Sequence, residues 1–460
     1  MLNHAHRIAA GAAMLLVSGF SAAHDGDLDR GFGTDGLTII DFGSTATAYG
    51  LAVDPNGRIV LGGVVDGGVA TGIDFAVARL TPDGQPDTSF SFDGKTTIAV
   101  GEGNAYDNNF NTIAQSDGKI VVIGEGADTA DPLDDADFKL VRLNTDGTLD
   151  ATFNGDGKAY VNFDLGGDNG DRALDGVQLA NGKLIVVGSA EVAGQGTDFA
   201  VARLNADGTR DTSFDGDGRV TFHFDLDPVN LDETASSVAI DANGNILVAG
   251  IAETAAANSY DWAIARLTPN GALDANFGGD GRVTISFDIG GSFDDEALEL
   301  IVAPDGSIFV TGVATDSGYD FAAVKLLPDG TPDASFGTNG KVTIPFDLGA
   351  TNTDIPYGAA LQPDGKLILV GYASLSDTDA DVALVRLDTD GTLDPSFGFD
   401  GKKIIGVNVF GNAFDAAVRG RIQNGYLVFG GVATTATDVT SFLAGRVIID
   451  TIFDNGFEPD

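Results

Sequence analysis

Carboxylates are the main source of chemistry in this chain. Its 460 residues include 68 Asp and Glu against 25 Lys and Arg, so the formal net charge is −43. Carboxylates bind hard cations, and pairs of them supply the general acid and base of many enzymes. The acidity therefore favours a cationic partner, such as a metal ion, a basic protein or a basic substrate. A charged surface also keeps an exported protein soluble, which is the simpler explanation.

Five carboxylates recur at one place in a repeating pattern. Asn-Gly and Asp-Gly pairs return about every 60 residues, and we examined the residue eleven positions before each of their glycines. This residue is Asp107, Asp171, Glu233, Asp295 or Asp354 in five cases, and Ala46 and Phe414 in the first and last. Gathered on one face, these carboxylates would form an acidic ring that binds a ligand or a cation. Alternatively, each caps backbone amides at the start of a strand, and its repetition favours this structural role.

Calcium is the one cofactor that the acidic loops suggest, although the sequence does not require any. The loop after the second repeated hairpin contains Asp128, Asp131, Asp134 and Asp135, which are weak candidates for metal ligands. The turns at 154–157 and 215–218 look partly like calcium loops, but each lacks the carboxylate two residues upstream. Glycine at positive φ and an Asp that bonds its own backbone explain these turns equally well.

Tyrosines near the variable loops are the remaining candidates for ligand binding. Tyr260 and Tyr319 are kept as such, together with Tyr372, because aromatic rings stack on sugars and on other flat groups. The supply is thin, since the chain contains 8 Tyr and 1 Trp. We expect Trp262 to be a core residue, because it replaces a repeated Phe.

Cysteine and histidine are nearly absent, which excludes several kinds of site. The chain has no Cys and 4 His, and His223 is the one histidine well inside the repeated region. Zinc sites built from Cys and His, Cys–His nucleophiles and most Ser–His–Asp triads need residues that this sequence lacks. His223 itself is expected to face solvent on an outer strand.

The N-terminal residues resemble a secretory signal peptide. Arg7 precedes an apolar run over 8–20, which is too short to span a bilayer, and Ser21-Ala22-Ala23 has the small residues of a cleavage site. We therefore divide the chain into a signal peptide (1–23), a single folded domain (24–450) and a C-terminal tail (451–460). The mature protein is expected to be exported, periplasmic or extracellular, without insertion into a membrane.

Seven similar units of about 60 residues make up the domain. The phrase DFAVARL occurs at 74–80 and again at 198–204, and its basic residue recurs at 79, 142, 203, 266, 325, 386 and 446. Along the strand, the Asp and Arg of this phrase point to opposite faces, so they cannot pair with each other. Each is expected to bond a loop or a neighbouring unit and so to stabilise the fold.

Each unit is predicted to contain four antiparallel strands. In the third unit, Asn181-Gly182 joins two apolar runs, and an Asn-Gly hairpin of two residues needs positive φ at both. The phrase DFAVARL then forms a third strand, and RVTFHF (219–224) alternates as an outer strand. Four strands repeated seven times predict an all-β fold, a seven-bladed β-propeller of four-stranded antiparallel blades. Because the chain begins with an outer-type strand, we expect Gly36–Phe42 to complete the last blade and close the ring.

These motifs resemble the delta-60 repeat of exported bacterial proteins. The similarity runs over about residues 28–450 and includes Leu149-Asp-Ala-Thr-Phe153, Pro363-Asp-Gly-Lys366 and Asp198-Phe-Ala-Val201. The seventh unit departs most, with Asn424-Gly-Tyr in place of Asp-Gly-Lys. The resemblance implies a β-propeller and export, and it implies no activity.

The sequence leaves three hypotheses for function. The first is an exported, non-enzymatic binding or scaffolding propeller that recognises a protein or surface polymer through an acidic loop face, with or without calcium. The second is a carboxylate-dependent glycoside hydrolase or polysaccharide lyase, and the third is a structural module of the envelope or matrix without a ligand. We favour the first, because the repeats are too alike for a catalytic propeller. Nucleic acid is not an expected partner, since clustered Lys and Arg are missing, and we expect a monomer.

Overall fold

The computed structural model describes most of the predicted domain. The described residues are 24–68, 72–100, 107–127, 136–167, 170–226, 232–254, 259–287, 294–316, 318–346, 348, 352–376, 378–407, 409–411 and 413–449. The predicted signal peptide (1–23) and tail (451–460) lie outside them. In the described part of the chain, no helix is long and apolar enough to cross a membrane.

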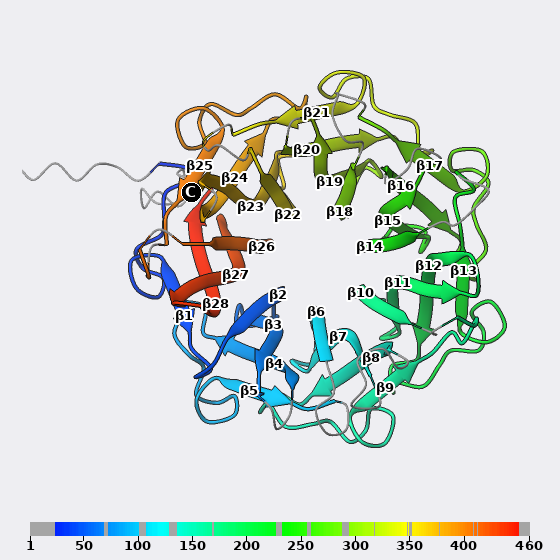
Figure 1. Cartoon of the computed structure of the whole chain (residues 1–460), viewed down its shortest axis with the longest axis horizontal. Helices are drawn as coiled ribbons and strands as arrows, with labels where there is room; N and C mark the ends of the chain where they lie inside the picture. The colour runs from blue at the N-terminus through cyan, green and yellow to red at the C-terminus, as the bar shows by residue number, and fades with distance from the viewer. Residues whose placement is uncertain are drawn as a thin grey trace, which may run out of the picture.

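The strands form seven four-stranded antiparallel blades around a central channel (Figure 1). Blades 1 to 3 consist of β2 (Ala46–Val53), β3 (Ile59–Asp66), β4 (Ile73–Leu80), β5 (Lys95–Ile98); β6 (Asp107–Ala114), β7 (Ile120–Ala127), β8 (Ala136–Leu143), β9 (Lys158–Val161); and β10 (Asp171–Gln178), β11 (Leu184–Val192), β12 (Gly196–Leu204), β13 (Arg219–Phe222). Blades 4 to 6 consist of β14 (Glu233–Ile240), β15 (Ile246–Glu253), β16 (Tyr260–Leu267), β17 (Arg282–Ile285); β18 (Glu296–Val302), β19 (Ile308–Thr315), β20 (Tyr319–Leu326), β21 (Lys341–Ile344); and β22 (Asp354–Leu361), β23 (Leu367–Ser376), β24 (Asp379–Leu387), β25 (Lys402–Ile405). The predicted seven-bladed propeller is confirmed.

The seventh blade is built from both ends of the described chain. Its sheet has the order β1 (Leu37–Ile40), β28 (Val439–Ile448), β27 (Tyr426–Ala436) and β26 (Asp415–Gln423). Strand β1 runs antiparallel to β28, with Leu37 opposite Gly445 and Ile40 opposite Phe442. In Figure 1 the blue β1 lies beside the red β28. The predicted closure by an N-terminal strand is therefore correct.

The core lies between the blades, because each sheet is apolar on both faces. Along β12 the side chains from Asp198 to Leu204 are all buried, which is why the phrase DFAVARL is apolar almost throughout. Hydrophobic residues of neighbouring blades pack into shared clusters, such as the one that joins Val186 of blade 3 to Phe138 of blade 2. Trp262 is fully buried, as predicted, and its Nε1 donates to the carbonyl of Val313 in blade 5, 3.0 Å away.

The repeated arginine joins its blade to the next in six blades, whereas Lys325 of blade 5 pairs with Asp333 of its own blade. In blade 3, Arg203 Nε donates to Asp211 Oδ2 at 2.6 Å, and the guanidinium lies over the Phe214 ring, 4.7 Å from its centroid. A third contact crosses to blade 4, where Nη1 donates to the carbonyl of Pro269. Burial alone would raise the pKa of Asp211, but hydrogen bonds from Lys183, Ser213 and Arg203 outweigh it and hold this pKa well below its usual range. The guanidinium is thus satisfied by its own blade and its neighbour together, which we call the interblade clamp.

The clamp also closes the ring. In blade 7, Arg446 Nε donates to Asp29 Oδ2 at 2.7 Å, and its guanidinium lies 5.0 Å from the centroid of Phe32. Its Nη1 donates to the carbonyl of Pro82 in blade 1. Asp29 and Phe32 precede β1, so the N-terminal segment supplies the same partners that other blades take from their own third turn.

The repeated hairpins differ from the prediction in one respect. At Asn181-Gly182 only the glycine has positive φ (84°), so the two-residue turn predicted there is wrong and the loop is one residue longer. The seventh unit alone among the described hairpins has the two-residue turn, with φ 50° at Asn424 and 81° at Gly425 and with Gln423 opposite Tyr426. Counting eleven residues back from Gly425 therefore overshoots by one, and the carboxylate equivalent to Asp354 is Asp415 rather than Phe414.

Removing one clamp should destabilise the ring. We expect Arg203→Met to lower the free energy of unfolding by about 3 kcal/mol, because the buried carboxylate of Asp211 loses one of its two cationic partners and the bond to blade 4 is lost. Urea denaturation followed by circular dichroism measures the change. The matched control is Arg210→Met, an exposed arginine of the same blade, which should change the free energy by less than about 0.5 kcal/mol. Equal effects of the two substitutions would contradict the role of the clamp.

Candidate functional site

The five carboxylates predicted as an acidic ring are buried at the crossovers between blades. Asp107, Asp171, Glu233, Asp295 and Asp354 are between 0 and 3% exposed. Each accepts a hydrogen bond from a backbone amide near the end of the preceding outer strand: those of Val100, Phe163, Phe224, Phe287 and Phe346. This is the geometry of the capping alternative.

Two of these caps, Asp295 and Asp354, also accept a second amide bond from their own blade and so connect two blades. Asp295 Oδ2 accepts from the amide of Phe287 in blade 4 at 2.8 Å, and its Oδ1 accepts from Thr315 in blade 5 at 3.0 Å. Asp354 makes the same pair of bonds to Phe346 and Ser374. Because these carboxylates are occupied by backbone amides, we look for the ligand site at their neighbours.

The residues on either side of Asp295 point the other way. Asp294 and Glu296 flank it in the sequence, and side chains alternate between the two faces of a strand. Asp294 pairs with Tyr260 in a parallel bridge, which brings the start of β18 beside the start of β16. Tyr319 makes the equivalent bridge to Thr353 of the next blade, and Asp294 and Glu296 lie close enough to affect both Tyr260 and Tyr319. We call Asp232, Glu253, Tyr260, Asp294, Glu296 and Tyr319 the acid–tyrosine group.

Electrostatics in this group favour protonated phenols and an acceptor-rich surface. Burial raises the pKa of Tyr260, and the carboxylates Glu253, Asp232, Asp294 and Glu296 raise it further. Burial followed by Glu296 and Asp294 raises the pKa of Tyr319 in the same way. Asp294 Oδ1 is buried from solvent and accepts no hydrogen bond from a described residue. A buried acceptor in this state needs an explanation, and a bound donor supplies one.

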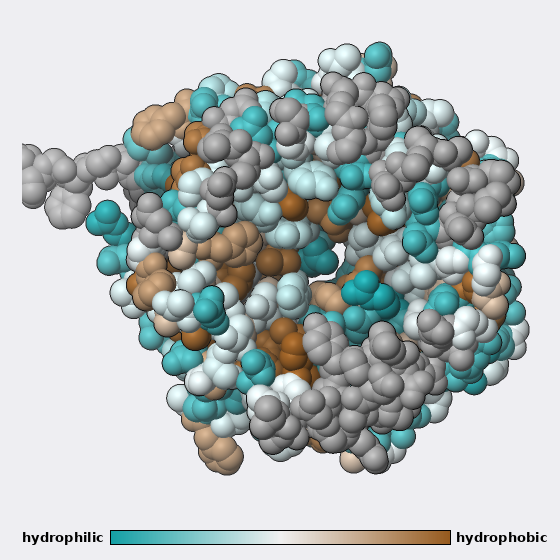
Figure 2. All heavy atoms as spheres, in the orientation of Figure 1, coloured by the Kyte–Doolittle hydropathy of each residue, from teal (hydrophilic) through white to brown (hydrophobic). Residues whose placement is uncertain are grey.

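Aromatic rings border the channel on the inner strands next to this group. Every inner strand contains a β-bulge, and bulges redirect side chains. Tyr49, Phe110 and Tyr357 occupy the bulges of blades 1, 2 and 6 and are partly exposed. The rings of Tyr49 and Phe110 lie 5.8 Å apart, and Tyr357 lies 5.9 Å from Tyr372. The tyrosines that looked scarce in the sequence are therefore concentrated near the channel, which opens at the centre of the space-filling view (Figure 2).

The metal candidates receive no support from the described residues. Asp128, Asp131, Asp134 and Asp135 lie outside them. In the turn at 154–157, Asp156 Oδ1 accepts from the amide of Lys158 at 2.9 Å, and Gly155 and Gly157 have φ of 94° and 93°. These are the bonds of an ordinary turn. Where the structure is described, no group of three or more His, Cys, Asp or Glu could hold a metal ion.

His223 belongs to a titratable cluster that the sequence did not predict. Its side chain is 44% exposed, in agreement with the predicted outer position, and its Nε2 lies 2.7 Å from Asp225 Oδ1. The predicted outer strand 219–224 is wrong at its end, because β13 stops at Phe222 and both oxygens of Glu233 bind the amide of Phe224 instead. Burial, together with Asp198 and Asp225, raises the pKa of Glu233 to about 8.

Comparisons with known proteins agree with the fold. The family model described as "Domain of unknown function (DUF5122) beta-propeller" matches residues 55–90, 115–153, 179–214, 242–277, 303–336 and 362–397, one segment in each of the first six blades. This match supports the predicted propeller family, whereas the delta-60 name stays a prediction. No curated protein matches the sequence.

Solved structures that resemble the chain are distant. They include the polysaccharide lyase Uly1 (10% identity, TM-score 0.46, covering 94% of each chain) and a PL25 ulvan lyase bound to -[GlcA(1-4)Rha3S]- (10%, 0.48, covering 93% of this chain and 95% of that one). Another is the α-L-arabinanase of Penicillium chrysogenum (11%, 0.45, covering 93% and 97%). At such identities and scores, these similarities carry no argument about activity.

The raised pKa of Glu233 predicts a pH dependence of stability. Its ordinary pKa is 4.5, so the protonated acid is favoured in the folded state. The resulting stabilisation is fully present below about pH 4.5 and is lost as the pH rises through about 8. In Glu233→Gln, the free energy of unfolding should fall less between these pH values than in the parent protein, as measured by urea denaturation at each pH. The exposed turn variant Asp215→Asn should keep the parent profile, and a parallel profile for Glu233→Gln would contradict the assignment.

The occupied carboxylates also predict that calcium does not stabilise the protein. Because the crossover carboxylates already bind backbone amides, chelation with EDTA should leave the melting temperature unchanged, and added calcium should not raise it. The prediction is wrong if calcium raises the melting temperature of the parent protein but not that of the double variant Asp171→Asn with Asp295→Asn. The acidic ring would then be a metal site.

Proposed function

We propose that the chain is an exported, non-enzymatic binding propeller that recognises a basic protein or surface polymer through its acidic loop face. The observation that carries this proposal is the acid–tyrosine group, in which Asp294 Oδ1 is an acceptor without a described donor. Its ligand presents hydrogen-bond donors with positive charge, such as ammonium groups. The protein acts as a monomer, and neither a metal nor nucleic acid takes part.

The chemistry of the group supports a donor-rich ligand. Four carboxylates raise the pKa of Tyr260, so an ammonium group placed among them would be stabilised by the same charges. The phenols of Tyr260 and Tyr319 remain protonated and offer their rings for stacking or for cation–π contact. Burial, followed by Asp294, also raises the pKa of Glu296. A cationic group would oppose this shift, so its binding would release a proton from Glu296 and would weaken at low pH, where Glu296 is neutral.

Chitosan oligomers are a suitable probe, because they combine a sugar ring with an ammonium group. Calorimetry should show that they bind, and that the N-acetylated oligomer of equal length binds at least about tenfold more weakly, since charge-assisted hydrogen bonds are lost. The double variant Asp294→Asn with Glu296→Gln should weaken chitosan binding by at least the same factor. Polylysine distinguishes a basic protein as the partner from a polymer of amino sugars.

The control variant removes the same number of negative charges as the loop-face variant, but from another part of the surface. Asp215→Asn with Asp400→Asn removes two exposed carboxylates from outer turns and should leave binding unchanged. If the control loses as much affinity as the loop-face variant, the overall acidity of the protein explains the binding and the proposed site is wrong. If the loop-face variant binds chitosan and polylysine as the parent does, the group is not the recognition site.

A further inference from the structure

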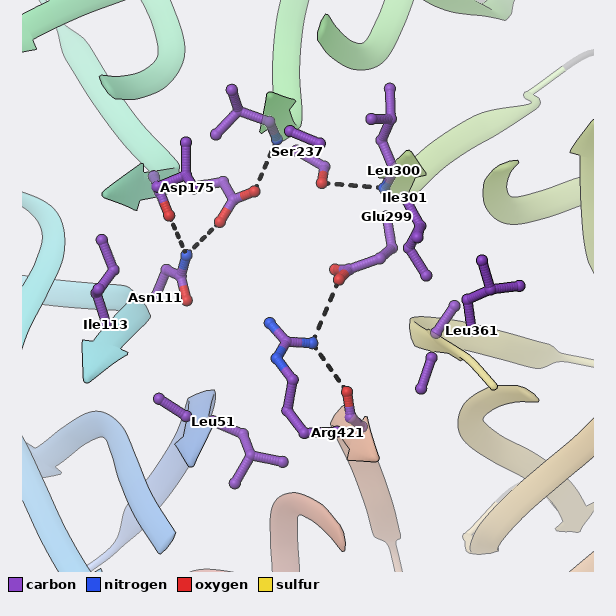
Figure 3. Close-up of a pocket in the computed structure, with 18 of the residues that line it drawn as sticks. Leu51, Asn111, Ile113, Asp175, Ser237, Glu299, Leu300, Ile301, Leu361 and Arg421 are labelled. Carbon is purple, nitrogen blue, oxygen red and sulfur yellow. Dashed lines mark hydrogen bonds and ion pairs between the residues drawn. The ribbon is translucent and has the colours of Figure 1, made fainter. Parts of the chain in front are cut away.

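The central channel contains a cavity that is separate from the acid–tyrosine group. Its volume is about 720 Å³, and all seven inner strands contribute to its wall. Figure 3 shows Glu299 and Arg421 reaching toward each other across it from β18 and β26. Because the wall is assembled from equivalent positions of repeated blades, any blade that departs from the others is easy to recognise.

One ring of equivalent positions is aliphatic in six blades and cationic in the seventh. These positions lie two residues after the register shift of each inner strand and all line the cavity: Ala52, Ile113, Val177, Ala239, Ile301, Ala360 and Arg421. At this position, a small or medium aliphatic side chain is enough to fill the space between neighbouring blades. The guanidinium of Arg421 is therefore not explained by the needs of the repeat.

The two carboxylates of the cavity wall already have partners. Asp175 accepts a hydrogen bond from the side chain of Asn111 and another from the amide of Val238, the latter at 2.8 Å (Figure 3). Glu299 pairs mainly with Arg419, whose Nη1 lies 3.0 Å from Oε2. Burial raises the pKa of Asp175, and Glu299 adds to this shift while Arg419 opposes it.

Arg421 retains donors that face the cavity. It is the one cationic residue in the cavity lining, and its side chain is 37% exposed. Its Nη1 donates to the carbonyl of Gly420 at 2.8 Å and lies 3.5 Å from Glu299 Oε1, which is long for a hydrogen bond. Its Nε and Nη2 make no hydrogen bond to a described residue. Two parallel N–H donors of a guanidinium match the two oxygens of a carboxylate.

The aliphatic residues in the rest of the wall favour a ligand with an apolar body. Leu51, Leu361 and Ile422 add to the aliphatic ring on the same wall. A chain with a net charge of −43 repels polyanions over a long range, so a single negative charge on an apolar body is favoured over a phosphate-rich or polycarboxylate ligand. Small-molecule sites commonly combine such an apolar wall with one or two placed polar groups.

We propose that the channel cavity binds a small monocarboxylate with an apolar body, whose carboxylate pairs with Nε and Nη2 of Arg421. This site goes beyond the binding of a basic partner on the loop face, and neither proposal depends on the other. The apolar body lies against the ring formed by Ile113, Val177 and Ile301. Glu299 stays paired with Arg419, and its long contact with Nη1 of Arg421 leaves Nε and Nη2 open to the carboxylate.

Calorimetric titration of the folded protein with sodium octanoate tests the proposal. We expect binding to one site per chain, and at least about tenfold weaker binding of octanamide, which has the same body without the charge. Arg421→Gln should weaken octanoate binding by at least the same factor and leave the weak binding of octanamide unchanged. Arg210→Gln is the control for total charge, since Arg210 is an exposed residue of an outer turn, and it should bind octanoate as the parent does.

Two further results would overturn the proposal. If octanamide binds as tightly as octanoate, the cavity is merely apolar and Arg421 does not recognise the carboxylate. If Arg421→Gln keeps its melting temperature and binds octanoate like the parent, or if the parent shows no heat of binding at millimolar octanoate, the site does not exist. A second variant, Ile301→Asn, should weaken octanoate more than it weakens acetate, because only the longer acid contacts the aliphatic ring.

Discussion

The propeller depends on keeping buried guanidinium groups fully hydrogen-bonded. A buried arginine without partners would destabilise the fold by several kcal/mol, roughly the stability of a whole domain. Arg203 is satisfied only when Asp211 of its own blade and the carbonyl of Pro269 in the next blade are both in place. Each clamp therefore fixes the angle and height of one blade relative to the next, and six of the seven blades have one.

Functional chemistry in such a ring is expected where a blade departs from the shared pattern. Positions that repeat, such as Asp295 and Asp354, serve the connections between blades, and their oxygens accept bonds from backbone amides. Asp294 shares its position with one other carboxylate, Asp232 of blade 4, and Arg421 is cationic where the other six inner strands are aliphatic. The first is an acceptor on the loop face without a described donor, and the second is a cation in an aliphatic ring. Both proposals made above rest on these departures.

Most of the fold could be predicted from the sequence, because the aligned repeats reveal the order of the strands and the strand that closes the ring. The site was less accessible. Aligning the units by a fixed count failed in the seventh, since the tighter turn at Asn424-Gly425 removes one residue and hides Asp415. The count also selected Asp295 and passed over its neighbours Asp294 and Glu296, although alternation along a strand would have placed them on the open side. Arg421 was missed because a charged residue on an inner strand stands out only against the aliphatic residues at the same position of other blades.

The closure of blade 7 determines how the ring would respond to mechanical force. Leu37 at the start of β1 lies opposite Gly445 near the end of β28, so residues 24 and 449 lie at the same end of this pair of strands. Tension applied between the two ends would first separate the backbone bonds of Gly26 and Asp27 to Ile448, then the Asp29–Arg446 pair, and then the four residue pairs of β1 and β28 one after another. Such peeling resists far less force than sliding all pairs at once. The ring would open at this seam while the other six blades stay folded, which would make blade 7 the point of mechanical failure.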